Sequence, residues 1–246
     1  MKTALYGRLI FGASAVLFGV IALIWHDPDT WQSMHRILSL PFGTIVGGLL
    51  MIAQILGGIG LVYSPTTRVA SIVLGVVYAL FAVACIPGIV AHPKVFGEYD
   101  GFFEQFALVS GALAAYAATE ANAARALLFG RAGRMGLGIS TVAFTLAQII
   151  YFQITVGLVP KWIPPNQTFW AILTTIAFAL AAAAMLVNRR ARLAMRLMTL
   201  MLALFGALVW IPLLVAHPEQ HANWSEFALN FLITGAAGTV AELRSF

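Results

Sequence analysis

Residues 7–24 read GRLIFGASAVLFGVIALI, and residues 133–150 read GRMGLGISTVAFTLAQII. Each stretch is almost wholly apolar, and a helix needs about 20 such residues to cross a hydrocarbon core of roughly 30 Å. The two stretches also share Gly, Arg, Ser, Val and Phe at matching positions. The length of the apolar stretches predicts membrane helices, and the residues that they share predict an internal duplication.

Nearly the same spacing, 124 to 126 positions, relates other parts of the chain. Residues 86–93 read IPGIVAHP and residues 211–218 read IPLLVAHP, with six of eight letters shared. Residues 68–81 align with residues 192–205 in the same way. We therefore expect two repeats of four helices each, residues 1–120 and 131–246. An even number of helices returns each repeat to its starting side, so the repeats are expected to be parallel.

Composition places the chain in a membrane. Hydrophobic residues make up 61% of the 246 residues, charged residues only 9%, and the mean hydropathy is +0.92, which leaves too little charge for a soluble surface. The single Cys excludes an intramolecular disulfide and dithiol chemistry. We predict an all-α polytopic protein with eight transmembrane helices, over residues 5–25, 41–62, 69–91, 102–119, 135–155, 167–187, 193–215 and 224–241.

The placement of basic residues predicts the orientation. Eleven Lys and Arg residues fall in the loops and ends on one side of this topology and three on the other, and short loops rich in Lys and Arg stay in the cytoplasm. Both termini are therefore expected in the cytoplasm of a multi-pass protein of a bacterial-type inner membrane. The net charge of +5 is explained by this asymmetry, so the expected partner is the lipid bilayer and not nucleic acid.

Two segments carry a family resemblance. Residues 159–173, VPKWIPPNQTFWAIL, and residues 41–70, PFGTIVGGLLMIAQILGGIGLVYSPTTRVA, resemble the DoxX-like family of small bacterial four-helix membrane proteins. The resemblance implies an integral subunit of a membrane oxidoreductase assembly that contacts a quinone or a redox partner protein. Family members often carry a Glu within the second helix, where this chain has Gln54 and, in the second repeat, Phe178.

A set of polar residues is predicted at the outer ends of the helices. His92 and His217 end the third and seventh helices, and Glu104 and Glu226 are expected to open the fourth and eighth. Helix capping and the helix dipole explain each of them separately. The alternative is one outward-opening site for a polar headgroup, a proton or a metal. The ligand spacing matches no known metal pattern, so no metal site is predicted.

Four further residues are candidates for lining a ligand site. Gln54 and Gln148 are costly in lipid unless they bond between helices, and they could instead touch the polar end of a buried hydrophobic ligand such as a quinone. Phe103 and Trp224 are expected to wall the outer site. No covalently bound cofactor is expected.

Three functional classes remain open from the sequence. The first is the oxidoreductase subunit or scaffold that the resemblance implies. The second is a carrier for a small hydrophobic solute. The third is a membrane enzyme that acts on a lipid or terpenoid with Glu and His as acid and base. No catalytic signature appears in the chain, so enzymatic activity is left undecided.

Overall fold

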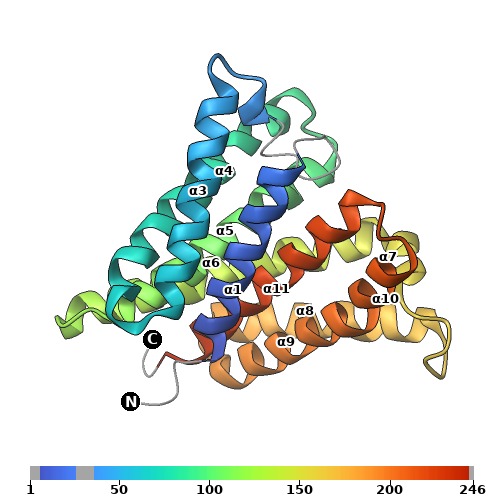
Figure 1. Ribbon diagram of the computed structural model, residues 1–246. Helices are drawn as coiled ribbons and strands as arrows, with labels where there is room; N and C mark the ends of the chain where they lie inside the picture. Colours follow the sequence, from blue (N-terminus) through green and yellow to red (C-terminus); the bar gives the residue numbers. More distant parts are fainter. Residues whose placement is uncertain (1–5, 26–35, 244–246) are drawn as a thin grey trace.

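The computed structural model describes residues 6–25 and 36–243, and within them every regular element is helical (Figure 1). The first half of the chain contains α1 (Tyr6–Ile24), α3 (Gly43–Val62), η1 (Ser64–Thr66), α4 (Thr67–Ala91) and α5 (Phe96–Ala117). The second half contains α6 (Ala123–Ile150), α7 (Phe152–Leu158), α8 (Gln167–Leu186), α9 (Ala191–Phe205), η2 (Gly206–Trp210), α10 (Ile211–Ala216) and α11 (His221–Ala241). The all-helical prediction is confirmed for this part of the chain.

Six of the described helical segments are long and apolar enough to cross a membrane. They are α1, α3, α4 with η1, α6, α8, and the run from α9 to α10. Their outward faces expose large apolar side chains, such as Ile45, Leu49 and Ile52 on α3 and Ile172 and Ile176 on α8. Exposed apolar surface of this extent marks contact with lipid or protein. The six helices together indicate a membrane protein.

The other two long helices, α5 and α11, are less apolar because they lie inside the molecule. α5 carries three acidic residues, and α11 carries Asn, Ser and Glu. The two helices pack against each other, and each also contacts helices of both halves. The last part of α11 is buried almost without a break, from Leu232 to Ala241. The small residues of this last part are therefore covered by other helices.

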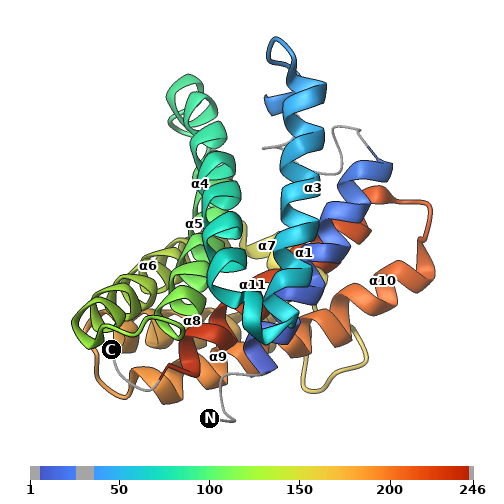
Figure 2. The same ribbon diagram turned by 60° about the vertical axis from the view of Figure 1, so that its left-hand side comes forward.

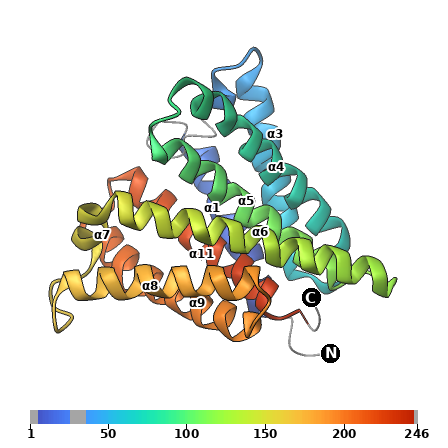
Figure 3. The same ribbon diagram turned by 180° about the vertical axis from the view of Figure 1, so that it is seen from behind.

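The helices form a closed ring of neighbours. Each helix packs on the next long helix along the chain, and α1 packs on α11 to close the ring. As a result, the first helix of each half packs on the last helix of the other half, α1 on α11 and α6 on α5 (Figure 3). The two halves spread apart from a shared end, with α3 and α4 in one arm and α8 to α10 in the other (Figures 1 and 2).

Glycines allow the closest of these crossings. A Cβ on Gly12 of α1 would lie 2.6 Å from the carbonyl oxygen of Gly58 on α3. A Cβ on Gly235 of α11 would lie 2.2 Å from the backbone nitrogen of Phe11. Since no real Cβ fits at these distances, the absence of side chains lets these backbones touch, as is common between membrane helices.

Basic residues tie the shared end together. Arg8 donates to the hydroxyls of Thr67 at 2.7 Å and Ser64 at 2.8 Å, which joins α1 to the turn between α3 and α4. Arg192 donates to the carbonyl of Leu243 at 2.9 Å, which joins α9 to the end of α11. Several basic residues that the sequence assigns to one side therefore lie in one hydrogen-bonded region.

Both His-Pro turns end a helix in the same way. His92 follows the last residue of α4 and His217 follows the last residue of α10, with nearly equal backbone angles. After each turn, an aromatic side chain donates a hydrogen bond to the carbonyl oxygen of the proline. Tyr99 donates to Pro93 at 3.1 Å, and Trp224 donates to Pro218 at 3.0 Å. These contacts fix the entry of the chain into α5 and α11.

Candidate functional site

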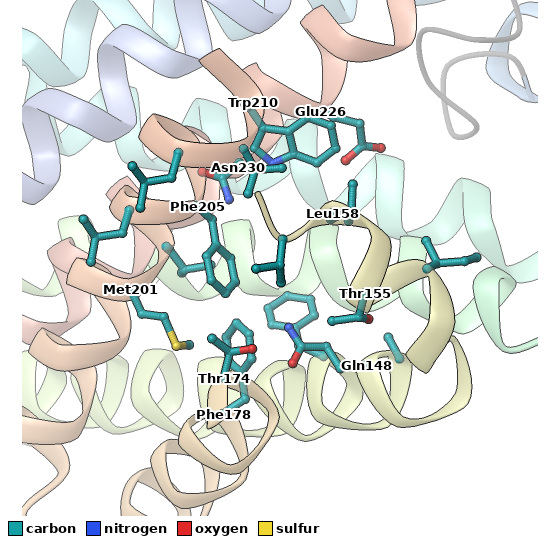
Figure 4. A pocket seen from close by; sticks show the side chains of 18 of the residues that line it. Gln148, Thr155, Leu158, Thr174, Phe178, Met201, Phe205, Trp210, Glu226 and Asn230 are labelled. Carbon is teal, nitrogen blue, oxygen red and sulfur yellow. The ribbon is translucent and has the colours of Figure 1, made fainter. Parts of the chain in front are cut away.

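An open cavity of about 510 Å³ lies in the second half, lined by α6, α7, α8, the run from α9 to α10, and α11 (Figure 4). α5 of the first half closes one side through Asp100 and Glu104. In Figure 4, Trp210, Glu226 and Asn230 lie at one end of the view, and Thr174, Phe178 and Gln148 lie at the other. The volume is that of a site for a small organic molecule, for which about 300–1,000 Å³ is usual.

The wall of the cavity is mainly apolar and rich in rings. Six aromatic residues line it: Phe144, Tyr151, Trp170, Phe178, Phe205 and Trp210. The rings of Phe144 and Phe205 each meet that of Phe178 edge to face, with centroids 6.2 Å apart. These contacts hold the inner rings in fixed orientations, so the wall is preformed.

Two breaks in regular α-helix give the cavity its shape. The first break is at Tyr151, which ends α6 after Ile150 and precedes α7. Opposite, η2 is a π-helical turn in which the N–H of Ile211 bonds to the carbonyl of Gly206, five residues back. Pro212 follows and has no N–H to donate, so it cannot continue the regular α-helical bonding there. Single π turns often occur at functional sites.

Gly206 is required at this turn. A Cβ there would lie 2.4 Å from the ring of Phe231 on α11. The π turn therefore lies close against α11 and directs Leu208, Val209 and Trp210 to the cavity.

Carboxyl groups provide the charge of the lining. Asp100 and Glu104 lie four residues apart on α5, and Glu226 and Asn230 lie four residues apart on α11. This spacing places each pair on one helix face. The carboxyl group of Glu104 repels those of Asp100 and Glu226 electrostatically. The described lining contains no Lys, Arg or His.

The sequence-based expectation that Glu104 and Glu226 open their helices is wrong. α5 begins at Phe96 and has Glu98 in its first turn, and α11 has no acidic residue in its first turn. The helix dipole acts mainly within that first turn. Dipole stabilisation therefore does not explain why Glu104 and Glu226 are acidic.

The predicted site residues are brought together only in part. Glu104, Glu226 and Gln148 line the cavity. Gln148 accepts a hydrogen bond from the hydroxyl of Thr175 at 2.8 Å, which joins α6 to α8. Gln54 lies outside the lining; it is fully buried and donates to the carbonyl of Ala15 at 3.0 Å, between α3 and α1.

The remaining candidates also lie outside the lining. His92 is exposed at the end of α4, and His217 is exposed and lies 3.6 Å from a carboxylate oxygen of Glu219. Phe103 contacts Phe102 edge to face, and Trp224 packs near Trp25 with ring centroids 6.1 Å apart. The two His-Pro turns therefore position the helices that carry the carboxylates, and their imidazoles are not part of the cavity.

Asp100 and Asn230 line the cavity but are not among the site residues that the sequence predicts. Asp100 lies in a stretch that reads as an outer loop, whereas the structure continues α5 back through it. The sequence does contain a signal for both residues. Asp100 lies four positions before Glu104 and Asn230 four positions after Glu226, so each shares a helix face with a predicted site residue. In the described part of the chain, the carboxylate, imidazole and thiol groups form no cluster of three or more that is suited to a metal ion.

The described part of the chain is an all-helical membrane protein with a cavity that is lined by aromatic rings and carries three carboxyl groups. Comparisons with protein-family models, with curated proteins and with solved structures gave no match. The resemblance to DoxX-like proteins therefore stays a prediction.

Proposed function

We propose that this protein binds a small, mainly apolar molecule from the membrane and carries or presents it through the cavity of its second half. The observation that supports this is the cavity itself, with about 510 Å³ of space inside one chain and a wall made mostly of apolar and aromatic side chains. Such a site fits a carrier or binding protein better than a scaffold, because a scaffold acts through its outer surface and needs no interior space.

The role as a subunit of an oxidoreductase assembly, taken from the family resemblance, is the second proposal. A quinone is a small hydrophobic molecule, so the cavity also suits the ligand that this role implies. Its ring would lie among the side chains of Phe144, Phe178 and Phe205, and the amide of Gln148 is a donor for a carbonyl oxygen. The two proposals differ in whether a protein partner is required.

Filling the cavity tests the first proposal. Thr174 lines the cavity, whereas its neighbour Leu173 is 42% exposed on the outer face of α8. The protein and its Thr174→Trp and Leu173→Trp variants are purified in mild detergent, extracted with organic solvent, and analysed by mass spectrometry. We expect one bound small molecule in the protein and in Leu173→Trp, and its loss in Thr174→Trp.

Equal amounts of the molecule in all three proteins would place it in the lipid annulus and refute the proposal. A stable protein partner without any small molecule would favour the oxidoreductase subunit instead.

We further propose eight membrane crossings, with both termini in the cytoplasm of a bacterial inner membrane. Support comes from the eleven-to-three division of basic residues and from the region where Arg8 and Arg192 bond to neighbouring helix ends. α5 and α11 would cross within the protein, shielded from lipid. Reporter fusions after residues 30, 96, 160 and 220 should all report the outside, and two cytoplasmic results would refute this topology.

We also propose that the chain is a tandem duplication, residues 1–120 and 131–246. Gly7 and Gly133, which align in the sequence, have matching contacts. A Cβ on Gly7 would meet the backbone of α11, and a Cβ on Gly133 would lie 2.8 Å from the carbonyl oxygen of Ser110 on α5. The matching geometry of the two His-Pro turns gives independent support.

A further inference from the structure

We propose that the cavity takes an amphiphilic organic cation, a molecule with an apolar body and one positive charge. This inference rests on the proposed function, because it names the chemical class of the small molecule that the cavity binds. It is carried by the joint presence of the cavity, its carboxyl groups and its aromatic rings.

The charged side chains of the lining are all acidic. Asp100, Glu104 and Glu226 line the cavity, and no basic side chain is among the described lining residues. Repulsion among the three carboxyl groups is unfavourable until a cation or protons enter.

The first half shows how the chain neutralises an acid when no ligand is involved. Glu98, in the first turn of α5, forms an ion pair with Arg36, and the other guanidinium nitrogen of Arg36 donates to the carbonyl of Cys85 at 3.1 Å. The pair lies against Gly88, where a Cβ would overlap both side chains. The described lining of the second-half cavity has no equivalent of Arg36.

The aromatic rings add a second recognition element. A cation within about 6 Å of a ring face is attracted by the quadrupole of that ring, and Trp gives the strongest effect. Two of the six Trp residues, Trp170 and Trp210, line the cavity together with Tyr151. The other end, around Phe178 and Met201, is mainly apolar, and its polar lining residues Gln148 and Thr174 are uncharged. An amphiphilic cation matches both regions, whereas a metal ion needs convergent ligands that the described residues do not provide.

The test compares two hydrophobic ions of the same shape and opposite charge. The full chain is placed in nanodiscs of neutral phosphatidylcholine, and binding of tetraphenylphosphonium and tetraphenylborate is measured by equilibrium dialysis. Binding to empty nanodiscs is subtracted. We expect saturable binding of tetraphenylphosphonium and no saturable binding of tetraphenylborate.

Carboxamide variants then locate the site. Asp100→Asn, Glu104→Gln and Glu226→Gln keep the side-chain volume and remove one charge each. Each should weaken tetraphenylphosphonium binding about tenfold, because each removes one negative charge that attracts the cation. Glu219→Gln is the matched control, because Glu219 is exposed near the same end and pairs with His217 outside the cavity. It should leave binding unchanged.

The outcomes separate this inference from the proposed function. Equal saturable binding of both ions, or tetraphenylphosphonium binding that the three cavity variants leave unchanged in folded protein, would overturn the cationic ligand. Recovery of a neutral molecule that Thr174→Trp excludes, without saturable binding of the cation, would also overturn it while the proposed function stands. Thermal unfolding of each variant shows whether the protein remains folded.

Discussion

Gly7 at the start of α1 lies directly against Gly238 near the end of α11: a Cβ on Gly7 would come within 2.3 Å of the carbonyl carbon of Gly238. One turn further along α11, Oε1 of Glu242 accepts a hydrogen bond from the N–H of Gly7 at 3.2 Å. These contacts close the ring of helices across almost the whole length of the chain. Closure therefore depends on the absence of a side chain at position 7.

Gly7→Ala should destabilise the protein by about 1–3 kcal/mol, because the added methyl group forces α1 away from α11. Gly48→Ala is the control, since a Cβ there meets nothing within 4 Å. The control should stabilise α3 by up to about 1 kcal/mol, as expected of Gly→Ala inside a helix. Thermal unfolding in detergent measures both, and equal unfolding temperatures would show that the crossing is not tight.

Gln54→Leu should change the free energy of unfolding by less than about 1 kcal/mol. The variant loses the bond from Nε2 to the carbonyl of Ala15, and interhelical hydrogen bonds in membranes contribute about 0.6 kcal/mol on average. It also removes the buried Oε1 atom, which has no partner among the described residues. Gln54→Ala should cost about 2 kcal/mol or more, because it leaves a cavity. A large loss for Gln54→Leu would show that the amide has a further partner.

Glu120 and the groups that contact it, from Tyr116, Asn122, Arg68 and Arg125 (the Glu120 cluster), should make part of the stability depend on pH. The pKa of Glu120 lies below its ordinary value of 4.5, mainly because the N–H of Asn122 donates to it. Partial burial opposes this shift, while the hydroxyl of Tyr116 and the charges of Arg125 and Arg68 add to it. A carboxyl group with a lowered pKa in the folded state stabilises the fold above its ordinary pKa. This stabilisation is lost as the pH falls through the lower folded value.

Glu120→Gln therefore should unfold at a lower temperature than the unmodified protein near pH 7, and the difference should shrink as the pH falls below the ordinary pKa of 4.5. A difference that does not change with pH would show that the cluster acts through shape and not through charge.

Arg36→Met should destabilise the first half by about 1.5–3 kcal/mol, because it leaves the carboxylate of Glu98 without its charged partner. The side chains are only 25% and 16% exposed, so solvent screens this pair less than a surface pair. Adding Glu98→Gln should restore most of the loss. A double-mutant cycle measures the coupling, and purely additive effects would contradict it.

The sequence predicts the helices well but not their neighbours. Each of the eight apolar windows falls on helix, and the window at 193–215 covers α9, η2 and α10, but the window at 135–155 begins well after the start of α6 and crosses the break at Tyr151 into α7. The start of α5 was placed too late because its acidic first turns read as a loop. Apolar periodicity specifies that a helix is buried, not which helix covers it, so the packing of α1 on α11 and of α6 on α5 could not be predicted.

Only part of the candidate site could be predicted from the sequence. Gln148 is predicted because a polar side chain in an apolar window is costly in lipid, and Glu104 and Glu226 are predicted because each follows a His-Pro turn at the outer end of a helix. The imidazoles of His92 and His217 were grouped with them on sequence proximity, but the turns direct α5 and α11 into the molecule and leave these residues exposed. The π turn at Gly206 has no pattern in the sequence beyond a nearby proline.

The exchange of end helices between the halves bears on how such a chain arises. A single unit of four helices would leave the sides of its first and last helices bare, since these are covered by the other half. Two separate units would therefore have to assemble as an intertwined pair, and joining them through residues 118–122 makes that pairing independent of concentration. If the chain is the duplication proposed above, the two copies would be free to diverge once joined, the first with its Arg36–Glu98 ion pair and the second with its cavity.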